Sequence, residues 1–354
     1  MGALQRAKLS EPLPFFQVMK IQAFAAAKAK GELKPFELEF GALHPEHVEI
    51  EVAYCGICHS DVAMIDNDWG FSAYPLVAGH EVVGKITAMG TAVKRVQPGQ
   101  LVGLGWFSQS CMSCHQCLSG DHNLCPQVEL TIAGRSGGFA QRVRCHWAWA
   151  TPVPAALDPA KAGPLFCGGV TVFNPIVQFG IRPTDRVGVI GIGGLGHLAL
   201  KFLNAWGCEV YAFTSSDSKR EEALKLGAHQ VINTHDTAAL GKIAGSMNFI
   251  LSTVAATLDW ATLLNVLAPK GRLHTIAAGA EPVALPVFPM LTGQKSFSSS
   301  PLASPATVES MLAFCARHAI EPVTELFPMS KINDGLERLR SGKARYRVVL
   351  ENDL

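Results

Sequence analysis

The stretch "DRVGVIGIGGLGH", residues 185–197, decides the fold of half of the chain. It places Gly191, Gly193 and Gly196 in a Gly-x-Gly-x-x-Gly pattern, between an apolar run and the helical segment "LGHLALKFLNAWG". In such a turn the first glycine bends sharply, the second lets backbone approach a pyrophosphate, and the third lets helix and strand pack closely. Because a second apolar run, "CEVYAF", follows, the segment predicts a Rossmann βαβ unit. The predicted cofactor-binding residues of the turn are Gly191, Gly193, Gly194, Leu195 and Gly196.

The pattern of elements differs on the two sides of residue 159. Residues 159–301 alternate strands and helices, which predicts a parallel, doubly wound sheet. Residues 19–158 contain short apolar runs separated by turn signals, which is typical of a β-barrel or sandwich. Residues 302–354 show two helical stretches and a closing strand, "RYRVVLE". Residues 1–18 show no period and are expected to form a flexible extension.

Composition narrows the possible functions. The 354 residues suit two domains, and 30 basic against 29 acidic residues leave a charge of +1. This balance excludes nucleic acid and anionic membrane as expected partners. The sequence shows no run of about 18 apolar residues and no signal peptide, so a cytoplasmic location is predicted. Ten cysteines, several at Cys-x-x-Cys spacing, indicate metal in a reducing compartment rather than disulfides.

The segment "CMSCHQCLSGDHNLCP" carries four cysteines that can converge from one loop. Four thiolates satisfy a tetrahedral Zn²⁺ with no open position, which defines a structural site. An iron–sulfur cluster is the competing interpretation, because Pro126 follows the last cysteine as in bacterial ferredoxins. The longer last gap and the absence of a second such run favour zinc. The predicted ligands are Cys111, Cys114, Cys117 and Cys125.

A second set of possible ligands is scattered along the chain. "YCGICHSDVAM", residues 54–64, contains Cys58, "GHEVVG" contains His80 and Glu81, and "LFCGGVTVF" contains Cys167. A catalytic zinc needs three protein ligands of these types and one open position. Each residue alone has a plainer interpretation, since a single cysteine is usually a small core residue.

In this order, with the four-cysteine segment between the second and third, the motifs "GICHSD", "GHEVVG" and "CGGVT" resemble zinc-dependent medium-chain alcohol dehydrogenases, in the cinnamyl-alcohol-dehydrogenase-like branch. The resemblance implies a GroES-like, partly open β-barrel catalytic domain over 19–158 and 302–354. Its structural zinc lobe would span 108–127. A Rossmann domain that binds NADP would span 159–301, and the protein is expected to be a homodimer.

The resemblance also implies roles for individual residues. Cys58, His80 and Cys167 would hold the catalytic zinc, with Glu81 as an alternative ligand during substrate exchange. Cys55 would be only a packing residue. The remaining implied roles are Asp61 orienting His80, Ser60 donating a proton to the substrate oxygen, Thr171 packing on the nicotinamide, and Trp69 and Phe71 lining the substrate pocket; Trp106 is left open between pocket and core.

Cofactor choice is predicted from the end of the second Rossmann strand, "FTSSDSKR". An acid there would bond the ribose 2′-OH of NAD and repel a 2′-phosphate. Thr214, Ser215 and Ser216 take its place and Lys219 follows, and hydroxyls with a cation suit a phosphate. Asp217 is the counter-indication, although it falls past the expected position. NADPH is therefore preferred over NADH.

Two positions depart from relatives. A histidine five residues after the ligand cysteine is replaced by Ala63, so the proton must leave through water or through His59, which is predicted to lie near the cofactor phosphates or ribose. Leu130 replaces a tryptophan of the plant cinnamyl enzymes. The predicted function is therefore broad NADPH-dependent reduction of aldehydes to primary alcohols with two zinc ions per chain. The alternatives are an NADP-binding protein without activity, as a sensor or structural protein, and an oxidative alcohol or polyol dehydrogenase.

Overall fold

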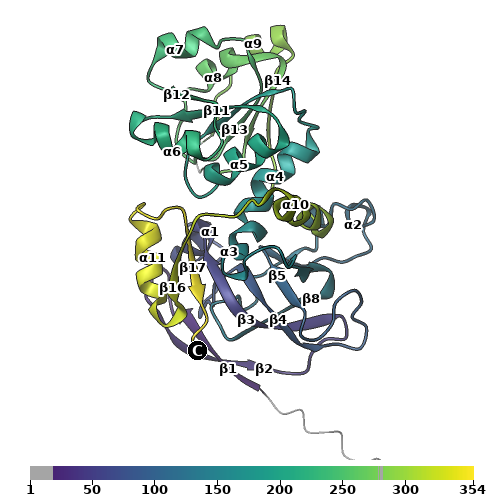
Figure 1. Cartoon of the computed structure of the whole chain (residues 1–354). Coiled ribbons are helices and arrows are strands. Elements are labelled where there is room, and N and C mark those ends of the chain that lie inside the picture. Colours follow the sequence, from purple (N-terminus) through teal and green to yellow (C-terminus); the bar gives the residue numbers. More distant parts are fainter. Residues whose placement is uncertain (1–18, 278, 280–281) are drawn as a thin grey trace, which may run out of the picture.

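The computed structural model describes residues 19–277, 279 and 282–354, and the predicted extension 1–18 lies outside these residues. The chain divides into a cofactor-type α/β half and a mainly β half, with α4 and α10 between them (Figure 1). Each half has its own core of buried apolar side chains. Among the described residues, no helix combines the length and apolarity that a membrane crossing requires.

The α/β half is built on a parallel sheet in the order β12-β11-β10-β13-β14-β15. This is the doubly wound order in which the crevice for a dinucleotide lies beside the first strand. β10 is the buried run "RVGVI" that precedes the glycine turn. The strands are β10 (Arg186–Ile190), β11 (Glu209–Thr214), β12 (Gln230–Asn233), β13 (Met247–Ser252), β14 (Leu267–Thr275) and β15 (Ser296–Ser299).

Helices pack on both faces of this sheet (Figure 1). α5 begins at Gly196, the last glycine of the turn, and is followed by Gly207, which adopts the left-handed conformation that glycine favours at a helix end. The helices of this half are α4 (Gly168–Gln178), α5 (Gly196–Trp206), α6 (Arg220–Lys225), α7 (Thr237–Lys242), α8 (Trp260–Val266), α9 (Val287–Gly293) and α10 (Pro305–His318).

The mainly β half contains a sheet in the order β16-β17-β3-β4-β5-β9, with β8 also paired to β3, and a separate β1-β2 hairpin. The described strands form no closed barrel, in agreement with the predicted partly open form. The strands are β1 (Met19–Ala26), β2 (Leu33–Phe40), β3 (His47–Ile57), β4 (Glu81–Met89), β5 (Leu101–Leu104), β6 (Phe107–Gln109), β7 (Glu129–Leu130), β8 (Arg142–His146), β9 (Thr151–Pro152), β16 (Thr324–Pro328) and β17 (Arg347–Glu351).

Short helices carry the loops of this half. α1 follows β3 directly, α2 and the 3-10 helix η1 lie in the four-cysteine segment, and the 3-10 helix η3 leads into α4. The bounds are α1 (His59–Asp66), α2 (His115–Leu118), η1 (His122–Leu124), α3 (Pro159–Ala162), η3 (Gly163–Phe166) and α11 (Ile332–Arg340).

The C-terminal segment contributes to both halves. β17 pairs with β3 and β16 in the mainly β half, whereas Met311, Leu312 and Cys315 of α10 join the core that contains β10 and α5. The domain boundaries predicted from the sequence, at 158/159 and 301/302, stay predictions.

Candidate active site and structural metal site

Cys58, His80, Glu81 and Cys167 meet in one buried cluster, although Cys58 and Cys167 are 109 residues apart. The sulfur atoms of the two cysteines lie 3.9 Å apart, and Nε2 of His80 lies 3.2 Å from Sγ of Cys167. A tetrahedral zinc with bonds of about 2.3 Å to sulfur places its sulfur ligands about 3.8 Å apart. The donor set and its spacing therefore fit a zinc ion.

The pairing of β3 with β4 brings two of these residues together. In this antiparallel pair Gly56 is the partner of Glu81, so Cys58 just beyond β3 and His80 just before β4 lie at the same end of the sheet. A Cβ at Gly56 would be 2.0 Å from Oε2 of Glu81, so this approach requires glycine. Cys167 enters from the other half, at the residue before α4.

Asp61 holds this arrangement through three hydrogen bonds. Its carboxylate accepts from the backbone N–H groups of Cys58 and Gly79, at 2.9 and 2.8 Å, and from Nδ1 of His80 at 2.9 Å. Because Nδ1 of His80 donates its proton to Asp61, Nε2 keeps its lone pair and faces Cys167. A histidine held in this way by a carboxylate is oriented and made more basic toward a metal.

Arg347 of β17 was not recognised in the sequence, where a lone arginine in a closing strand carries no local signal. Its buried guanidinium donates to Oε1 of Glu81, while Oε2 of Glu81 has no hydrogen-bond partner in the described part of the chain. A buried, unpaired carboxylate oxygen among two thiols and an imidazole fits an additional metal ligand. Burial raises the pKa of Glu81, and the charge of Arg347 opposes that effect.

Electrostatics favour the ionised form of Cys58. A hydrogen bond from Cys167 lowers the pKa of the Cys58 thiol well below its ordinary value, against the effect of burial, and Arg347 and His80 lower it further. Thiolate is the form that binds metal. Cys55 differs, because burial raises the pKa of its thiol well above the ordinary value and its Sγ donates to the carbonyl of Gly56 at 3.6 Å.

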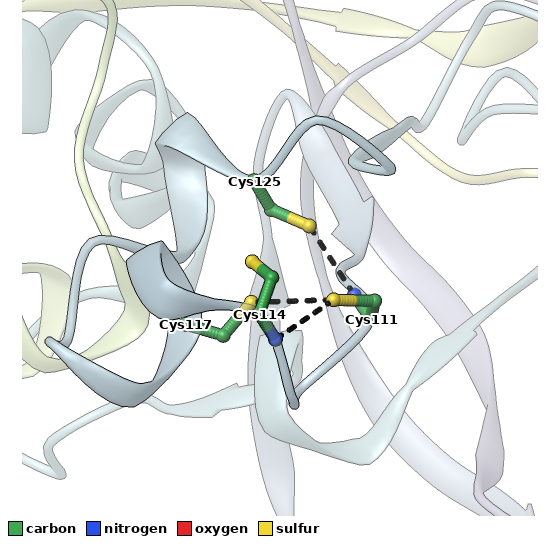
Figure 2. Close-up of side chains that lie close together, drawn as sticks. All are labelled: Cys111, Cys114, Cys117 and Cys125. Carbon is green, nitrogen blue, oxygen red and sulfur yellow. Dashed lines mark hydrogen bonds between the residues drawn. The ribbon is translucent and has the colours of Figure 1, made fainter.

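The four cysteines of the lobe also converge, as Figure 2 shows. Sγ of Cys111 lies 4.0 Å from Sγ of Cys117 and accepts the N–H of Cys114 at 3.3 Å, and Sγ of Cys125 accepts the N–H of Cys111 at 3.5 Å. Backbone hydrogen bonds lower the pKa of Cys111 to about 6. Four thiols within ligand distance, with N–H groups directed at two of them, fit a closed zinc site.

The glycine turn has the geometry that its sequence predicts. Gly191 has φ +86°, and a Cβ at Gly196 would lie 1.8 Å from the carbonyl oxygen of Gly191, so helix and strand are in direct backbone contact. At Gly193 a Cβ would meet no described atom within 4 Å, which leaves this face of the turn open. At Gly194 it would lie 3.1 Å from Nη1 of Arg347. Arg347 therefore connects the turn to the metal cluster.

The hydroxyl-rich end of β11 lies beside the same turn. Thr214 is the last residue of β11, and Nζ of Lys219 donates to the carbonyl of Ile192 within the glycine turn at 3.2 Å. Ser215 and Ser216 are exposed. The carboxylate of Asp217 is paired with Arg220, at 3.6 Å, and accepts a hydrogen bond from Asn233.

Aromatic side chains cover the His80 side of the cluster. Trp106 meets His80 edge to face, with ring centroids 4.9 Å apart, and Trp69 meets Trp106 in the same way at 5.7 Å. Phe71 stacks on Trp69 at 5.9 Å. Trp69 and Phe71 are partly exposed, so the three rings run from the metal ligand to the surface.

Other predicted site residues lie nearby or are linked to the ligands. Ser60 Oγ is 3.9 Å from Sγ of Cys58, and the Thr171 hydroxyl donates to the carbonyl of Cys167 at 2.7 Å. His59 is the exposed first residue of α1. Their roles stay predictions.

Comparison with known proteins agrees with this geometry. The model of the alcohol dehydrogenase GroES-like domain matches residues 44–155, and that of the zinc-binding dehydrogenase matches residues 194–317. Aldehyde reductase AdhA of Synechocystis is 54% identical over 332 residues, covering 94% of this chain and 99% of that protein. Probable cinnamyl alcohol dehydrogenase 8A of rice is 39% identical, covering 93% of this chain and 94% of that protein.

Solved structures give the same result. A cinnamyl alcohol dehydrogenase from Sorghum bicolor superposes with a TM-score of 0.90 at 36% identity, covering 94% of this chain and 98% of the other. A Helicobacter pylori enzyme of this type, complexed with NADP(H), gives 0.86 at 27%, covering 95% and 99%. The chain belongs to the zinc-dependent medium-chain alcohol dehydrogenases, in the cinnamyl-alcohol-dehydrogenase-like branch. The expected GroES-like and Rossmann architecture is thereby confirmed.

Proposed function

We propose that the protein reduces a broad range of aldehydes to primary alcohols with NADPH. The observation that carries the proposal is the buried cluster of Cys58, His80 and Cys167, next to a glycine turn built for a dinucleotide. Arg347 holds Oε1 of Glu81, whereas Oε2 has no hydrogen-bond partner among the described residues and could act as an alternative ligand; when Glu81 is not bound, the fourth ligand position is open to substrate. The aldehyde reductase from Synechocystis, 54% identical, supports this direction of reaction.

The chemistry divides between the bound groups and the chain. Zinc supplies Lewis acidity at the substrate oxygen, and NADPH supplies hydride. Asp61 keeps His80 in the tautomer that binds metal, and Thr171, fixed on the carbonyl of Cys167, presents its side to the nicotinamide. Ser60 donates the proton to the substrate oxygen. With Ala63 at the relay position, a replacement proton would reach Ser60 from solvent through water or through His59, which is exposed at the start of α1.

NADPH is supported by the end of β11. Thr214, Ser215 and Ser216 offer hydroxyl donors where an acid would reject a 2′-phosphate. Lys219, already bonded to the turn at Ile192, adds positive charge. Asp217, the possible objection, is directed to Arg220 and Asn233. The related enzyme complexed with NADP(H) is consistent with this choice.

The substrate pocket is formed by Trp69, Phe71 and Trp106. These rings present flat apolar surface that suits both aliphatic chains and aromatic rings. An apolar pocket discriminates by only about 10- to 200-fold per methylene, so broad specificity follows.

The homodimer is supported by the α9 region. Val287, Phe288 and Leu291 are 74%, 74% and 71% exposed, and β15 next to them is the edge strand of the sheet. The segment "PVALPVFPMLTG" therefore contributes exposed apolar surface, while its Leu285 and Met290 pack against the core. A second copy that pairs its β15 with this β15 would cover the apolar surface of α9 and provide partners for the unpaired backbone N–H and C=O groups of the edge strand. Six of the ten free cysteines sit in the two metal clusters, which supports a reducing, cytoplasmic compartment.

An aldehyde panel tests the proposal. Aliphatic and aromatic aldehydes are assayed with NADPH and NADH, before and after treatment with a zinc chelator. We expect reduction of several aldehydes with NADPH, loss on chelation, and recovery with Zn²⁺. An oxidative polyol enzyme would instead be most active with alcohols and NAD, and an NADP-binding sensor would show binding without turnover.

A further inference from the structure

One buried histidine in the cofactor half is not used by the reaction described above. His197, the second residue of α5, is fully buried and lies directly after the glycine turn. Its ring stacks on Tyr346, with centroids 4.7 Å apart and planes 12° from parallel. Tyr346 immediately precedes Arg347, the residue that contacts both Gly194 and Glu81.

The hydrogen bonds of the ring fix its protonation state. Nδ1 lies 3.0 Å from the carbonyl oxygen of Gly193, which can only accept, so Nδ1 carries the proton. Nε2 accepts the N–H of Val323 at 3.2 Å. Both ring nitrogens are therefore satisfied by a neutral imidazole. Burial lowers the pKa of His197 to about 3, in keeping with this geometry.

Val323 continues the connection toward the metal cluster. Its carbonyl oxygen accepts the N–H groups of Tyr346 and Arg347, at 2.9 and 3.0 Å. Through the imidazole of His197 and the backbone of one residue, Val323, the carbonyl of Gly193 is thus linked to the backbone of Arg347. The guanidinium of Arg347 in turn lies against Gly194 and donates to Glu81.

A second side chain of α5 reinforces the link. Lys201, one turn after His197, donates from Nζ to the carbonyl of Glu321 at 2.7 Å. Residues four apart lie on the same face of a helix, so His197 and Lys201 both hydrogen-bond to the backbone of residues 321–323. Lys161 of α3 holds the carboxylate of Glu321 at 2.7 Å from the other side.

We infer that His197 is a positioning residue, which couples the dinucleotide turn to Arg347 and so sets the position of the cofactor pyrophosphate relative to the metal cluster. The inference rests on the proposed function for its effect on catalysis, but not for its effect on cofactor binding. Its action is indirect. The ring orients the carbonyl of Gly193 and the backbone of Val323, and these two groups fix the position of the glycine turn relative to Arg347.

The test compares three variants of the full-length, zinc-loaded protein. His197→Phe keeps a ring against Tyr346 and removes both hydrogen bonds, whereas His197→Gln keeps an acceptor for Val323. His229→Phe is the control, because His229 also accepts a backbone N–H, from Val210 at 3.0 Å, but is an exposed residue directly before β12, which pairs with the edge of β11 opposite to β10. Dissociation constants for NADPH and NADH are measured by nucleotide fluorescence without aldehyde, together with zinc content, kcat and KM.

For His197→Phe we expect about a tenfold weaker binding of the nucleotide, the usual effect of losing one or two orienting hydrogen bonds. The variant should retain two zinc ions per chain, and its KM for NADPH should change more than its kcat. His197→Gln should recover part of the loss, and His229→Phe should bind like the wild type. Nucleotide binding within twofold of the wild type in His197→Phe, or an equal loss in His229→Phe, overturns the inference. Since binding needs no aldehyde, a wild-type protein that reduces no aldehyde contradicts the proposed function and leaves this test intact.

Discussion

The sulfur atoms of Cys58 and Cys167 lie 3.9 Å apart across the junction of the two halves of the molecule. Cys58 follows β3 of the mainly β half, and Cys167 precedes α4, which packs against α5 of the cofactor half. The metal cluster therefore forms only when both halves are folded and docked. Its position next to Arg347 places it beside the dinucleotide turn.

Replacing Cys58 distinguishes the catalytic zinc site from the structural zinc site. Cys58→Ser removes one thiolate of the buried cluster, so we expect zinc content to fall from about two ions per chain to about one. Activity should fall about a thousandfold, because several kcal/mol of charge stabilisation are lost. Cys55→Ser is the control, since Cys55 is a buried core residue outside the group of possible zinc ligands. Elemental analysis and aldehyde reduction provide the measurements; equal zinc loss in both variants would contradict the ligand assignment.

Asp61→Asn tests the orientation of His80. The amide cannot accept from Nδ1 of His80, Cys58 N–H and Gly79 N–H as the carboxylate does. We expect zinc affinity at this site to fall about 10- to 100-fold, measured by titration with a chelator. Asp66→Asn, at the other end of α1, weakens the ion pair with Arg340 and should leave zinc affinity unchanged. An unchanged affinity in Asp61→Asn would rule out this role.

Ser215→Asp tests the cofactor assignment. A carboxylate at the end of β11 repels a 2′-phosphate and bonds a ribose 2′-OH, so the preference should move from NADPH toward NADH. We expect the ratio of kcat/KM values to change at least about tenfold, which corresponds to about 1.4 kcal/mol. Ser310→Asp adds the same charge at an exposed position of α10 and should leave the ratio unchanged. A preference that Ser215→Asp does not alter would refute the assignment.

Phe288→Glu tests the dimer. A charge in the apolar surface of α9 opposes its burial against a second copy, so light scattering should show a shift from dimer to monomer. Leu118→Glu is the control, because Leu118 is equally exposed, at 77%, but lies on the zinc lobe. If both variants have the mass of the wild type, α9 is not the interface.

His274 should make stability depend on pH. The ring is fully buried between Ser298 and Ser300, and burial together with Arg272 lowers its pKa to about 4. The unfolded chain takes up this proton near pH 6.5 and the folded chain only near pH 4. The contribution of neutral, buried His274 to the free energy of unfolding is therefore complete above pH 6.5 and is lost as pH falls toward 4.

We expect the melting temperature to fall between pH 7.5 and pH 5, and to fall less in His274→Gln, which stays neutral throughout. Calorimetry of both proteins at the same zinc content measures the difference. Equal decreases in the two proteins would assign the pH dependence to other groups.

The sequence was sufficient for the parts of the site that depend on spacing. The four lobe cysteines lie in one loop, and the glycine turn lies between a strand and a helix, so local pattern specifies both. Cys58, His80 and Cys167 are not local, and only the resemblance to a family joined them. Once β3 is paired with β4, the register of Gly56 with Glu81 explains why two of the three meet.

Other features depend on tertiary contacts without a local signature. Arg347 is one cation in a closing strand, and its function follows only from its contact with Glu81 and Gly194. β15, "SFSS", is too polar to be recognised as a strand, and forms because β14 offers it an edge. Two consecutive glycines do not by themselves predict a helix, yet Gly168 and Gly169 begin α4, where they allow close packing beneath Leu195 and Leu165.

The two metal clusters enclose very different lengths of chain. Cys58 and Cys167 are separated by 109 residues, and Cys111 and Cys125 by only 14. Since loop-closure entropy costs about 0.6 kcal/mol per doubling of length, an ion at the first cluster restricts the unfolded chain by about 1.8 kcal/mol more than one at the second. The catalytic ion thus cross-links segments that are far apart in the sequence, and its removal should make the whole molecule sensitive to proteases. Removal of the structural ion should allow cleavage only within the zinc lobe.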